Sequence, residues 1–515
     1  MTSTFHSIET ARRGLATTTT SLSTVSHNIA NANTAGYSRQ VVHTSATNPL
    51  EAVAFRNSTN SGQLGTGVEA TAIKRVRSMF LDTQYRGENS SLGSWTVRSD
   101  TLSKLEKVIN EPSDTGMQTV INKFWSAWSN LSKDPQSTTN QKVLKETTLA
   151  LTDAMNQTSQ QLDALSTDLT SSVALDVSTV NSLMNTVGTL NQNIMKIEAQ
   201  GNDANDLRDQ RDYAIDQISK YGNVTVTELN TGYQVNFGGQ QVITGGTVTP
   251  LTAAGVQTAF EGGTLNSGEM YGLMYSRDVN VAGQKAQLDQ LANTLANGEF
   301  NVTLPAGSVI PEGTVINGVT YSDAARNRTL TSDLTTTVKG INGLHKLGYN
   351  SSSEQGGDFF GTKDNSGTVT ASNITLSKSL QNDPSKIAFS LRTSGTGASE
   401  KVVAGNGGLA LLMSELKGTK MDFGGVSSTT VQDYFNGIVG QLGVSSQEAS
   451  RQTDNSQTLT DQVEASRQSV SGVSLDEEMS DLVKFQHAYT ASSRFMTTMD
   501  QLLERLINST GRVGL

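Results

Sequence analysis

The strongest constraint in this sequence is a seven-residue spacing of apolar residues at both ends of the chain. Near the N-terminus the row consists of Ile8, Leu15, Leu22 and Ile29. Near the C-terminus a longer row, with its companions, consists of Leu475, Leu482, Tyr489, Met496 and Leu503, flanked by Phe485, Met499 and Leu506. A sustained seven-residue period keeps one apolar stripe of a helix facing a partner helix. The sequence therefore predicts terminal helices that pair with each other and pack against further copies of the chain.

The length and composition limit the classes of protein that remain. A chain of 515 residues is too long for one hydrophobic core, so about two to four domains are expected. Only 35% of the residues are apolar and 5% are aromatic, which favours an elongated body over a compact enzyme. The net charge of −10 argues against nucleic acid or an anionic membrane as a partner, because both attract basic surfaces.

Cysteine usage and the terminal sequence bear on the compartment. The chain has no cysteine, which excludes disulfides, thiolate metal sites and cysteine nucleophiles. The first residues lack the apolar core of a cleaved secretory signal, and no window of about eighteen apolar residues exists. We expect a protein that stays in the cytosol or leaves it without a cleaved signal peptide.

The interior alternates between helical and β-type patterns. Helix is expected over 92–220, where Val173, Val180, Val187 and Ile194 form a seven-residue row, and again over 268–296, 330–347 and most of the chain after 408. Alternation of apolar and polar residues with glycine predicts β hairpins from 223, over 300–327 and over 350–399.

These patterns predict an elongated, multidomain α+β fold. Paired N- and C-terminal helices would form a coiled-coil core domain from 1–60 with 470–515. A long helical rod domain would combine 61–220 with 268–297, 330–347 and 400–469. One or more β-rich outer domains inserted in the middle would combine 221–267 with 298–329 and 348–399.

Residues suited to catalysis or metal binding are scarce. None of the five histidines, His6, His27, His43, His345 and His487, has another at the spacing that places two on one helix face for a metal. No phosphate-binding loop with the required lysine occurs, and the Gly-rich fragments lack the strand and helix of a dinucleotide site. We therefore expect no enzyme activity, no cofactor and no metal, although a serine triad scattered along the chain is not excluded.

Two charged segments are interpreted as solvated surface. The basic residues Lys74, Arg75 and Arg77 are expected on an exposed strand or turn. The acidic stretch Asp203, Asp206, Asp209 and Asp212, with Asn205, lacks the glycine and final glutamate of an EF-hand loop. It is interpreted as the solvated start of a helix.

A polar motif follows the N-terminal seam directly. It runs from His27 to Gln40 and includes Asn28, Asn31, Thr34, Gly36 and Tyr37. Gly36 is expected to adopt a positive φ that ends the helix, and an extended run from Tyr37 to Thr44 follows. Read physically, this is an ordinary helix end. The string nevertheless closely resembles the N-terminal signature of the flagellar axial proteins, the rod, hook and hook-associated family.

The C-terminus and interior extend this resemblance. Ser474 and Glu477 form a possible capping box, and the helix that they open resembles the C-terminal helix of the family around Phe485 and Tyr489. Segments 124–135 and 205–226 resemble the hook-associated members. The resemblance covers the whole chain and is weakest over 298–329 and 361–399.

The resemblance implies a structural protein of the bacterial flagellum that forms a ring at the hook tip and joins hook to filament. It implies a monomer in solution, export through the flagellar type III pathway without cleavage, and a cytosolic chaperone at the C-terminal region. The implied partners are copies of itself, the hook protein and a second junction protein, and the implied location is the extracellular flagellum. The predicted assembly interface comprises both seams together with Asn28, Asn31, Thr34, Gly36 and Tyr37.

Two alternatives stay open at this point. Hook and distal rod proteins share the terminal signatures, but they are expected to be mainly β between the ends. An axial protein whose insert is adhesive or enzymatic is the alternative from another class. The ring's subunit number, the chaperone contacts and the strand order of the outer domains do not follow from the sequence.

Overall fold

A computed structural model of the protein describes residues 5–49, 65–111, 113, 116–424 and 428–509. The chain forms two compact units: unit 1 consists of Met1–Trp95, Ala174–Tyr271 and Thr453–Leu515, and unit 2 of Thr96–Val173 and Gly272–Gln452. Four of the described helices belong partly to each unit: α2 (Met79–Ile109), α4 (Thr138–Glu198), α7 (Glu269–Tyr275) and α12 (Val431–Ser471). The three-part division expected from the sequence stays a prediction.

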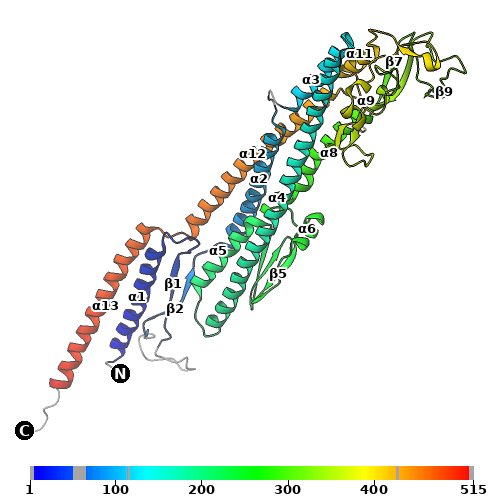
Figure 1. Cartoon of the computed structure of the whole chain (residues 1–515). Helices are drawn as coiled ribbons and strands as arrows, with labels where there is room; N and C mark the ends of the chain where they lie inside the picture. The colour runs from blue at the N-terminus through cyan, green and yellow to red at the C-terminus, as the bar shows by residue number, and fades with distance from the viewer. Residues whose placement is uncertain (1–4, 50–64, 112, 114–115, 425–427, 510–515) are drawn as a thin grey trace, which may run out of the picture. The chain divides into compact units, whose positions relative to one another are not determined.

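The two ends of the chain meet in unit 1. Helices α1 (Phe5–Asn31) and α13 (Leu475–Ser509) lie side by side (Figure 1). They run antiparallel, because Asn28 contacts Glu478 while a Cβ added at Gly14 would lie 3.5 Å from Ser492 Oγ. The predicted terminal helices and their pairing within the chain are therefore confirmed.

A two-stranded antiparallel ribbon covers another side of α1. Strand β1 (Gln40–Ala46) pairs with β2 (Val68–Arg75), with Gln40 opposite Arg75 and Ala46 opposite Val68. The Thr17 hydroxyl of α1 donates a hydrogen bond to the carbonyl oxygen of Val68 at 3.3 Å. A lone hairpin is at best marginally stable in water, so the ribbon depends on its contacts with α1 and with α5 (Asn205–Tyr221), which Asn205 makes by donating to the Ile73 carbonyl oxygen at 2.6 Å.

The rest of unit 1 is built on α4 and on α5 (Asn205–Tyr221). The predicted row is confirmed on α4, where Val180 and Val187 are fully buried and Ile194 is 3% exposed. A four-stranded antiparallel meander follows, in the order β3 (Val224–Leu229), β4 (Gly232–Phe237), β5 (Gln240–Thr244) and β6 (Thr247–Val248). The short helix α6 (Ala253–Glu261) and the first residues of α7 complete it.

Unit 2 combines helices with small sheets around an aromatic core. On α3 (Met117–Lys133), Phe124 and Trp128 lie next to Phe359, with ring centroids 6.3 and 5.2 Å away. A π-helical turn, η1 (Ser276–Val281), leads into α8 (Ala282–Asn297), and the later helices are α9 (Gly340–His345), α10 (Lys378–Asn382) and α11 (Gly408–Glu415). The sheets are the antiparallel pairs β7 (Glu299–Leu304) with β10 (Leu334–Lys339), β8 (Val315–Ile316) with β9 (Val319–Thr320), β11 (Phe360–Thr362) with β12 (Ile374–Leu376), and β13 (Thr393–Ser394) with β14 (Lys401–Val402).

The helix expected over 330–347 is wrong. Leu334–Lys339 forms strand β10, and only Gly340–His345 is helical. Thr335, Thr336, Thr337 and Val338 are β-branched, and such residues favour a pleated strand with a paired neighbour over a helix. The apolar residues that suggested a helix are instead distributed over a strand and one short helix.

His345 is a buried neutral imidazole in the core of unit 2. Its Nε2 accepts a hydrogen bond from the backbone N–H of Ala388 at 2.9 Å, so Nδ1 carries the proton and donates to the carbonyl oxygen of Gly357 at 2.7 Å. Burial lowers the pKa of His345 to about 4. A second proton would face the Ala388 N–H, and the fold therefore favours the neutral ring.

This arrangement predicts an acid-sensitive unit 2. The folded pKa lies below the unfolded value, so the stabilisation is complete above about pH 6.5 and is lost as the pH falls to about 4. Replacing His345 by Gln should remove about 1 to 3 kcal/mol from this pH dependence of the unfolding free energy. Urea unfolding at several pH values, followed by tryptophan fluorescence in a Trp95→Phe background so that only Trp125 and Trp128 report, measures it. An unchanged dependence of the unfolding free energy on pH in the His345→Gln variant would contradict the assignment.

Candidate functional site

The polar motif after α1 is organised by one amide side chain. Asn28 is 1% exposed, and its Oδ1 accepts hydrogen bonds from the Tyr37 hydroxyl at 2.8 Å and the Gln40 backbone N–H at 3.0 Å. Its Nδ2 donates to the Gln40 carbonyl at 2.9 Å and to Glu478 Oε2 at 3.1 Å. Both N–H groups of Nδ2 donate and both lone pairs of Oδ1 accept, a combination that a side chain of this size offers only as an amide.

Glu478 brings α13 to this motif. It is 1% exposed and is the only residue of α13 that is buried among residues 475–508. Arg39 Nε lies 2.6 Å from Glu478 Oε1, and the Arg39 N–H donates to the Ser471 carbonyl at 2.8 Å. We call Asn28, Tyr37, Arg39, Gln40 and Glu478 the terminal latch.

The expected capping box at the start of α13 is half formed. The Glu477 N–H donates to Ser474 Oγ at 3.4 Å, as a capping box requires. The Glu477 carboxylate, however, lies 2.9 Å from Arg39 Nη1. The first turn of α13 is therefore held by the latch as well as by its own cap.

A buried group of opposite charges lies beside the latch in unit 1. Arg75 Nη1 is 2.7 Å from Asp209 and 2.9 Å from Asp212, while Asp216 pairs with Arg86 at 2.6 Å and with Arg467 at 2.8 Å. Each side chain in the group is at most 11% exposed. We call this group the ion cluster, and its members are Arg75, Arg77, Asp82, Arg86, Asp209, Asp212, Asp216 and Arg467.

Two interpretations from the sequence are corrected here. Arg75 and Arg77 are buried ion-pair partners rather than solvated residues, although Lys74 is exposed as expected. Asp203 and Asp206 are exposed, but Asp209 and Asp212 are not solvated. Helical spacing carries these two, with Asp216, to one face of α5.

The pKa values of two carboxyl groups in the ion cluster are shifted in opposite directions. Burial alone would raise the pKa of Asp212, but Arg77, Arg75 and Arg86 outweigh burial and hold that pKa below its usual value. Burial raises the pKa of Asp209 in spite of Arg75 and of hydrogen bonds from Ser38. Asp212 is thus the strongly ionised centre of the cluster.

The turn that follows α1, residues 32–38, which we call the signature turn, is attached to α5 through the same cluster. The backbone N–H and the hydroxyl of Ser38 donate to the two carboxylate oxygens of Asp209 at 2.9 and 2.8 Å. Gly36 has a φ of +80°, as expected, and a Cβ there would lie 2.8 Å from Cβ of Tyr213. Any larger residue would lift the turn from α5.

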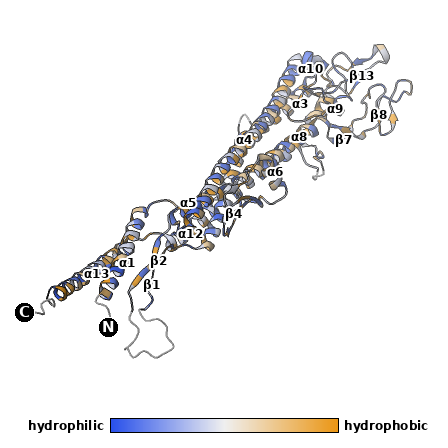
Figure 2. Ribbon diagram, turned by 90° about the horizontal axis from the view of Figure 1, so that it is seen from below, coloured by the Kyte–Doolittle hydropathy of each residue, from blue (hydrophilic) through white to orange (hydrophobic). Residues whose placement is uncertain are grey.

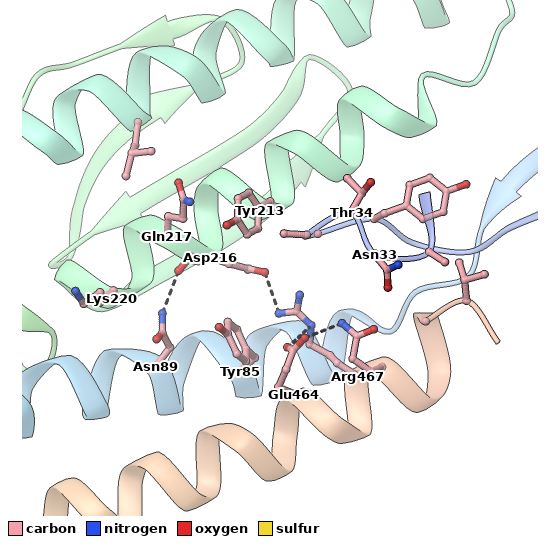
Figure 3. Close-up of a pocket in the computed structure, with 18 of the residues that line it drawn as sticks. Asn33, Thr34, Tyr85, Asn89, Tyr213, Asp216, Gln217, Lys220, Glu464 and Arg467 are labelled. Atoms are coloured by element: carbon pink, nitrogen blue, oxygen red, sulfur yellow. Dashed lines mark hydrogen bonds and ion pairs between the residues drawn. The ribbon is translucent and has the colours of Figure 1, made fainter. Parts of the chain in front are cut away.

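A cavity of about 670 Å³ lies between the signature turn, α2, α4, α5 and α12 in unit 1 (Figure 3). Asn89 Nδ2 donates to the Asp216 carbonyl at 3.1 Å, and Arg467 pairs with Asp216. Tyr85 and Tyr213 also line the cavity, and no histidine is among its described lining residues. Across the described part of the chain, no group of three or more His, Asp or Glu residues is placed to bind a metal ion.

The predicted seam residues lie on α1 and α13 and differ in how far they are buried. Glu478 of α13 contacts Asn28 of α1, and Phe485 and Met499 share the seven-residue column of Glu478. The half-buried seam residues are Ile8, Leu15, Leu22, Ile29, Leu482, Phe485, Met496, Met499 and Leu503. Leu475, Tyr489 and Leu506 are 50, 39 and 53% exposed.

The remaining predicted residues lie in the last turn of α1 (Asn28 and Asn31) and in the turn that follows it (Thr34, Gly36 and Tyr37). Asn31 donates to the His27 carbonyl at 3.0 Å and accepts a hydrogen bond from the exposed Thr34 hydroxyl at 3.2 Å. Asn28, Gly36 and Tyr37 are held as described above. That any of these residues lies at a subunit interface stays a prediction.

The sequence reasoning missed apolar residues beside the seam. These are 44 to 67% exposed, and each lies one position before or after a residue of the seam columns; we call Met479, Val483, Phe495, Leu502 and Ile507 the flanking residues. The ribbon of α13 shows hydrophobic stretches along its length (Figure 2). A search for apolar residues on both sides of the seven-residue row would have found them.

Known proteins resemble both the ends and the interior. Residues 8–37 match the family model described as flagella basal body rod protein, and residues 458–509 match flagellar basal body rod FlgEFG protein C-terminal. Residues 102–310 match the flagellar hook-associated protein FlgK helical domain. The end matches are thus shared with rod proteins, whereas the interior match is to a hook-associated protein.

A solved structure and two sequence relatives are all hook junction or hook-associated proteins. The flagellar hook junction protein FlgK from Burkholderia pseudomallei has a similar fold, with a TM-score of 0.52, 13% identity and coverage of 76% of this chain and 100% of that one. Flagellar hook-associated protein 1 of Escherichia coli is 23% identical over 97% of this chain and 99% of its own. Its counterpart in Bacillus subtilis is 33% identical over an alignment of 534 residues that covers all of both chains. The chain belongs to the flagellar hook-associated protein 1 family.

Membership of the hook-associated protein 1 family confirms the predicted multidomain α+β class and the junction role. The chain is a structural protein of the bacterial flagellum, at the junction of hook and filament. It assembles within the flagellum with copies of itself and with the hook. Among the helices described, none combines the length and apolarity of a membrane span.

The terminal latch of this hook-associated protein should control the start of α13. Replacing Asn28 by Ala removes its hydrogen bonds to Glu478 Oε2, to the Gln40 backbone and from the Tyr37 hydroxyl, at a cost of about 1 to 3 kcal/mol, although Glu478 keeps its ion pair with Arg39. Amide exchange of residues 475–485 in the monomer should accelerate accordingly, while exchange in α5 stays slow. Asn33→Ala, in the exposed part of the same turn, is the matched control. Equal exchange in both variants would show that Asn28 does not hold α13.

Proposed function

We propose that this chain forms a ring at the hook tip on which the second junction protein and then the filament assemble. The chain leaves the cell through the flagellar type III pathway without cleavage, after a cytosolic chaperone has covered its C-terminal region. The proposal assigns it no catalytic activity. The observation that carries the proposal is α13, a 35-residue helix with large apolar residues exposed on both sides of its contact with α1.

The distribution of apolar residues on α13 supports assembly through this helix. In a coiled coil, one partner helix covers two neighbouring seven-residue rows of apolar residues, and α1 is that partner for α13 within the chain. The flanking residues widen the apolar stripe beyond what one helix covers. We infer that neighbouring subunits cover the flanking residues, while the seam itself serves the pairing of α1 with α13. Before export, the same exposed apolar residues are the surface that a chaperone would shield.

The proposed role predicts a specific phenotype. A strain that lacks this protein should build intact hooks without attached filaments, because the ring that follows the hook would be absent. Electron microscopy of cells and a motility assay measure this, and the wild-type gene should restore filaments. Cells without hooks would instead favour a hook protein.

Flanking-residue variants in that strain test the proposed interface. Phe495→Asp or Leu502→Asp places a charge where a neighbour would pack, so filament attachment should fail while the purified monomer keeps its stability. Leu482→Asp and Met496→Asp should instead weaken the pairing of α1 with α13. Gln501→Asp, at an exposed polar position of the same helix, is the matched control. Normal filaments with Phe495→Asp and Leu502→Asp would exclude the flanking residues from the interface.

We also propose that the far part of α13 gains its full order on assembly. Its residues are half-buried or exposed beyond Glu478, so packing within one chain offsets little of the entropy of ordering a long helix. In the monomer, residues from about 490 to 509 should exchange their amides almost as fast as an unfolded chain. Slow exchange along the whole helix would contradict the proposal and would leave the latch prediction untouched.

A further inference from the structure

A carboxyl group without a counterion of its own is buried in unit 1. Asp176, on α4, is 8% exposed, and no hydrogen-bond donor reaches its buried Oδ2 among the described residues. Burial, followed by the charge of Glu269, raises the pKa of Asp176 to about 7, and Lys220 only partly opposes this. An ionised carboxylate in such a place is costly.

The charged and titratable groups around Asp176 come from two other elements. Glu269 is the first residue of α7, and its Oε2 lies 3.2 Å from Nζ of Lys220, near the end of α5. Lys220 is 55% exposed and is already paired with Glu269. Tyr221, also on α5, has its pKa raised by burial, with smaller contributions from Glu269 and Asp176. Lys220 is therefore ion-paired with Glu269, and its charge only partly offsets the effect of burial on Asp176.

The backbone around these groups leaves no room for small adjustments. A Cβ at Gly93 of α2 would lie 2.4 Å from the Lys220 carbonyl oxygen and 3.2 Å from the Glu269 nitrogen. Gly268 has a φ of +95°, and a Cβ there would lie 2.3 Å from Cα of Gly222. The end of α5 and the start of α7 are thus packed tightly against α2. The start of α7, with Glu269, therefore cannot be displaced slightly toward α2 to relieve repulsion from Asp176.

We propose that Asp176, Glu269 and Lys220 form a pH-sensitive clasp within unit 1, which is tight when Asp176 is protonated and loosens when it ionises. In mild acid the protonated Asp176 needs no counterion, and Lys220 serves Glu269 alone. Near neutral pH two carboxylates share one lysine, and local opening exposes Asp176 to water. Lys220 and Tyr221 also line the cavity beside the signature turn, so the clasp acts on one wall of that cavity.

The sign and range of the effect follow from linkage. The folded pKa is raised from 3.8 to about 7, so the closed clasp is favoured fully at low pH and loses that advantage as the pH rises to about 7. The equilibrium constant for local opening should rise about tenfold per pH unit over that interval. Above about pH 7 it should level off, because both states are then ionised.

Amide exchange of the full chain, corrected for intrinsic rates, tests the clasp at pH 5, 6, 7 and 8. Protection of peptides spanning 214–222 and 262–272 should fall about tenfold per unit from pH 5 to 7 and then remain constant. Asp176→Asn should be protected at every pH, and Asp168→Asn, an exposed aspartate on the same helix, should behave as the wild type. Glu269→Gln, which removes the opposing charge, should shift the levelling point to lower pH. The clasp is overturned if Asp176→Asn keeps the wild-type pH profile or if Glu269→Gln leaves the levelling point unchanged.

Discussion

The ion cluster of unit 1 is the interaction on which the rest of that unit depends. Its aspartates and arginines are taken almost completely out of water, which is tolerable only because each charge has partners at hydrogen-bond distance. Removing one partner would leave a buried charge uncompensated, at a cost of about 3 to 5 kcal/mol. The cluster joins β2, α2, α5 and α12, and their relative placement within unit 1 is therefore set by directional bonds.

Hydrogen bonds and ion pairs connect the terminal helices to this cluster. Ser38 binds Asp209, so the turn that follows α1 is tied to α5. Arg39 and Gln40 then connect that turn to Glu478 through the latch. Only one residue of α13 is buried between residues 475 and 508, and it is a polar residue of the latch. Polar bonds thus fix where α13 begins, while its apolar residues stay accessible for association, a division that suits a subunit of a larger assembly.

The periodic features of this chain could be predicted from the sequence, and the long-range polar ones could not. The seven-residue rows predicted α1, α13 and the buried face of α4, because a helix period is a local property. Arg75 and Asp212 are 137 residues apart, and nothing in the sequence near either residue indicates its partner. Strand alternation does place Arg75 and Lys74 on opposite faces of the ribbon, so one of them was bound to be less exposed. The run of β-branched residues at 335–338 likewise carried a strand signal that the apolar spacing obscured.

Asp212 on α5 and Asp176 on α4 show how the same residue type behaves in opposite ways within unit 1. Several arginines hold the pKa of Asp212 below its usual value, whereas burial and the charge of Glu269 raise the pKa of Asp176, and Lys220, paired with Glu269, opposes this only in part. The cluster residue Asp209 and the clasp residue Lys220 are separated along α5 by about 16 Å, at 1.5 Å of rise per residue. Local opening at the Lys220 end therefore breaks no bond of the signature turn to Asp209. A strongly paired anchor at one end of a helix allows the other end to respond to pH without disturbing the latch.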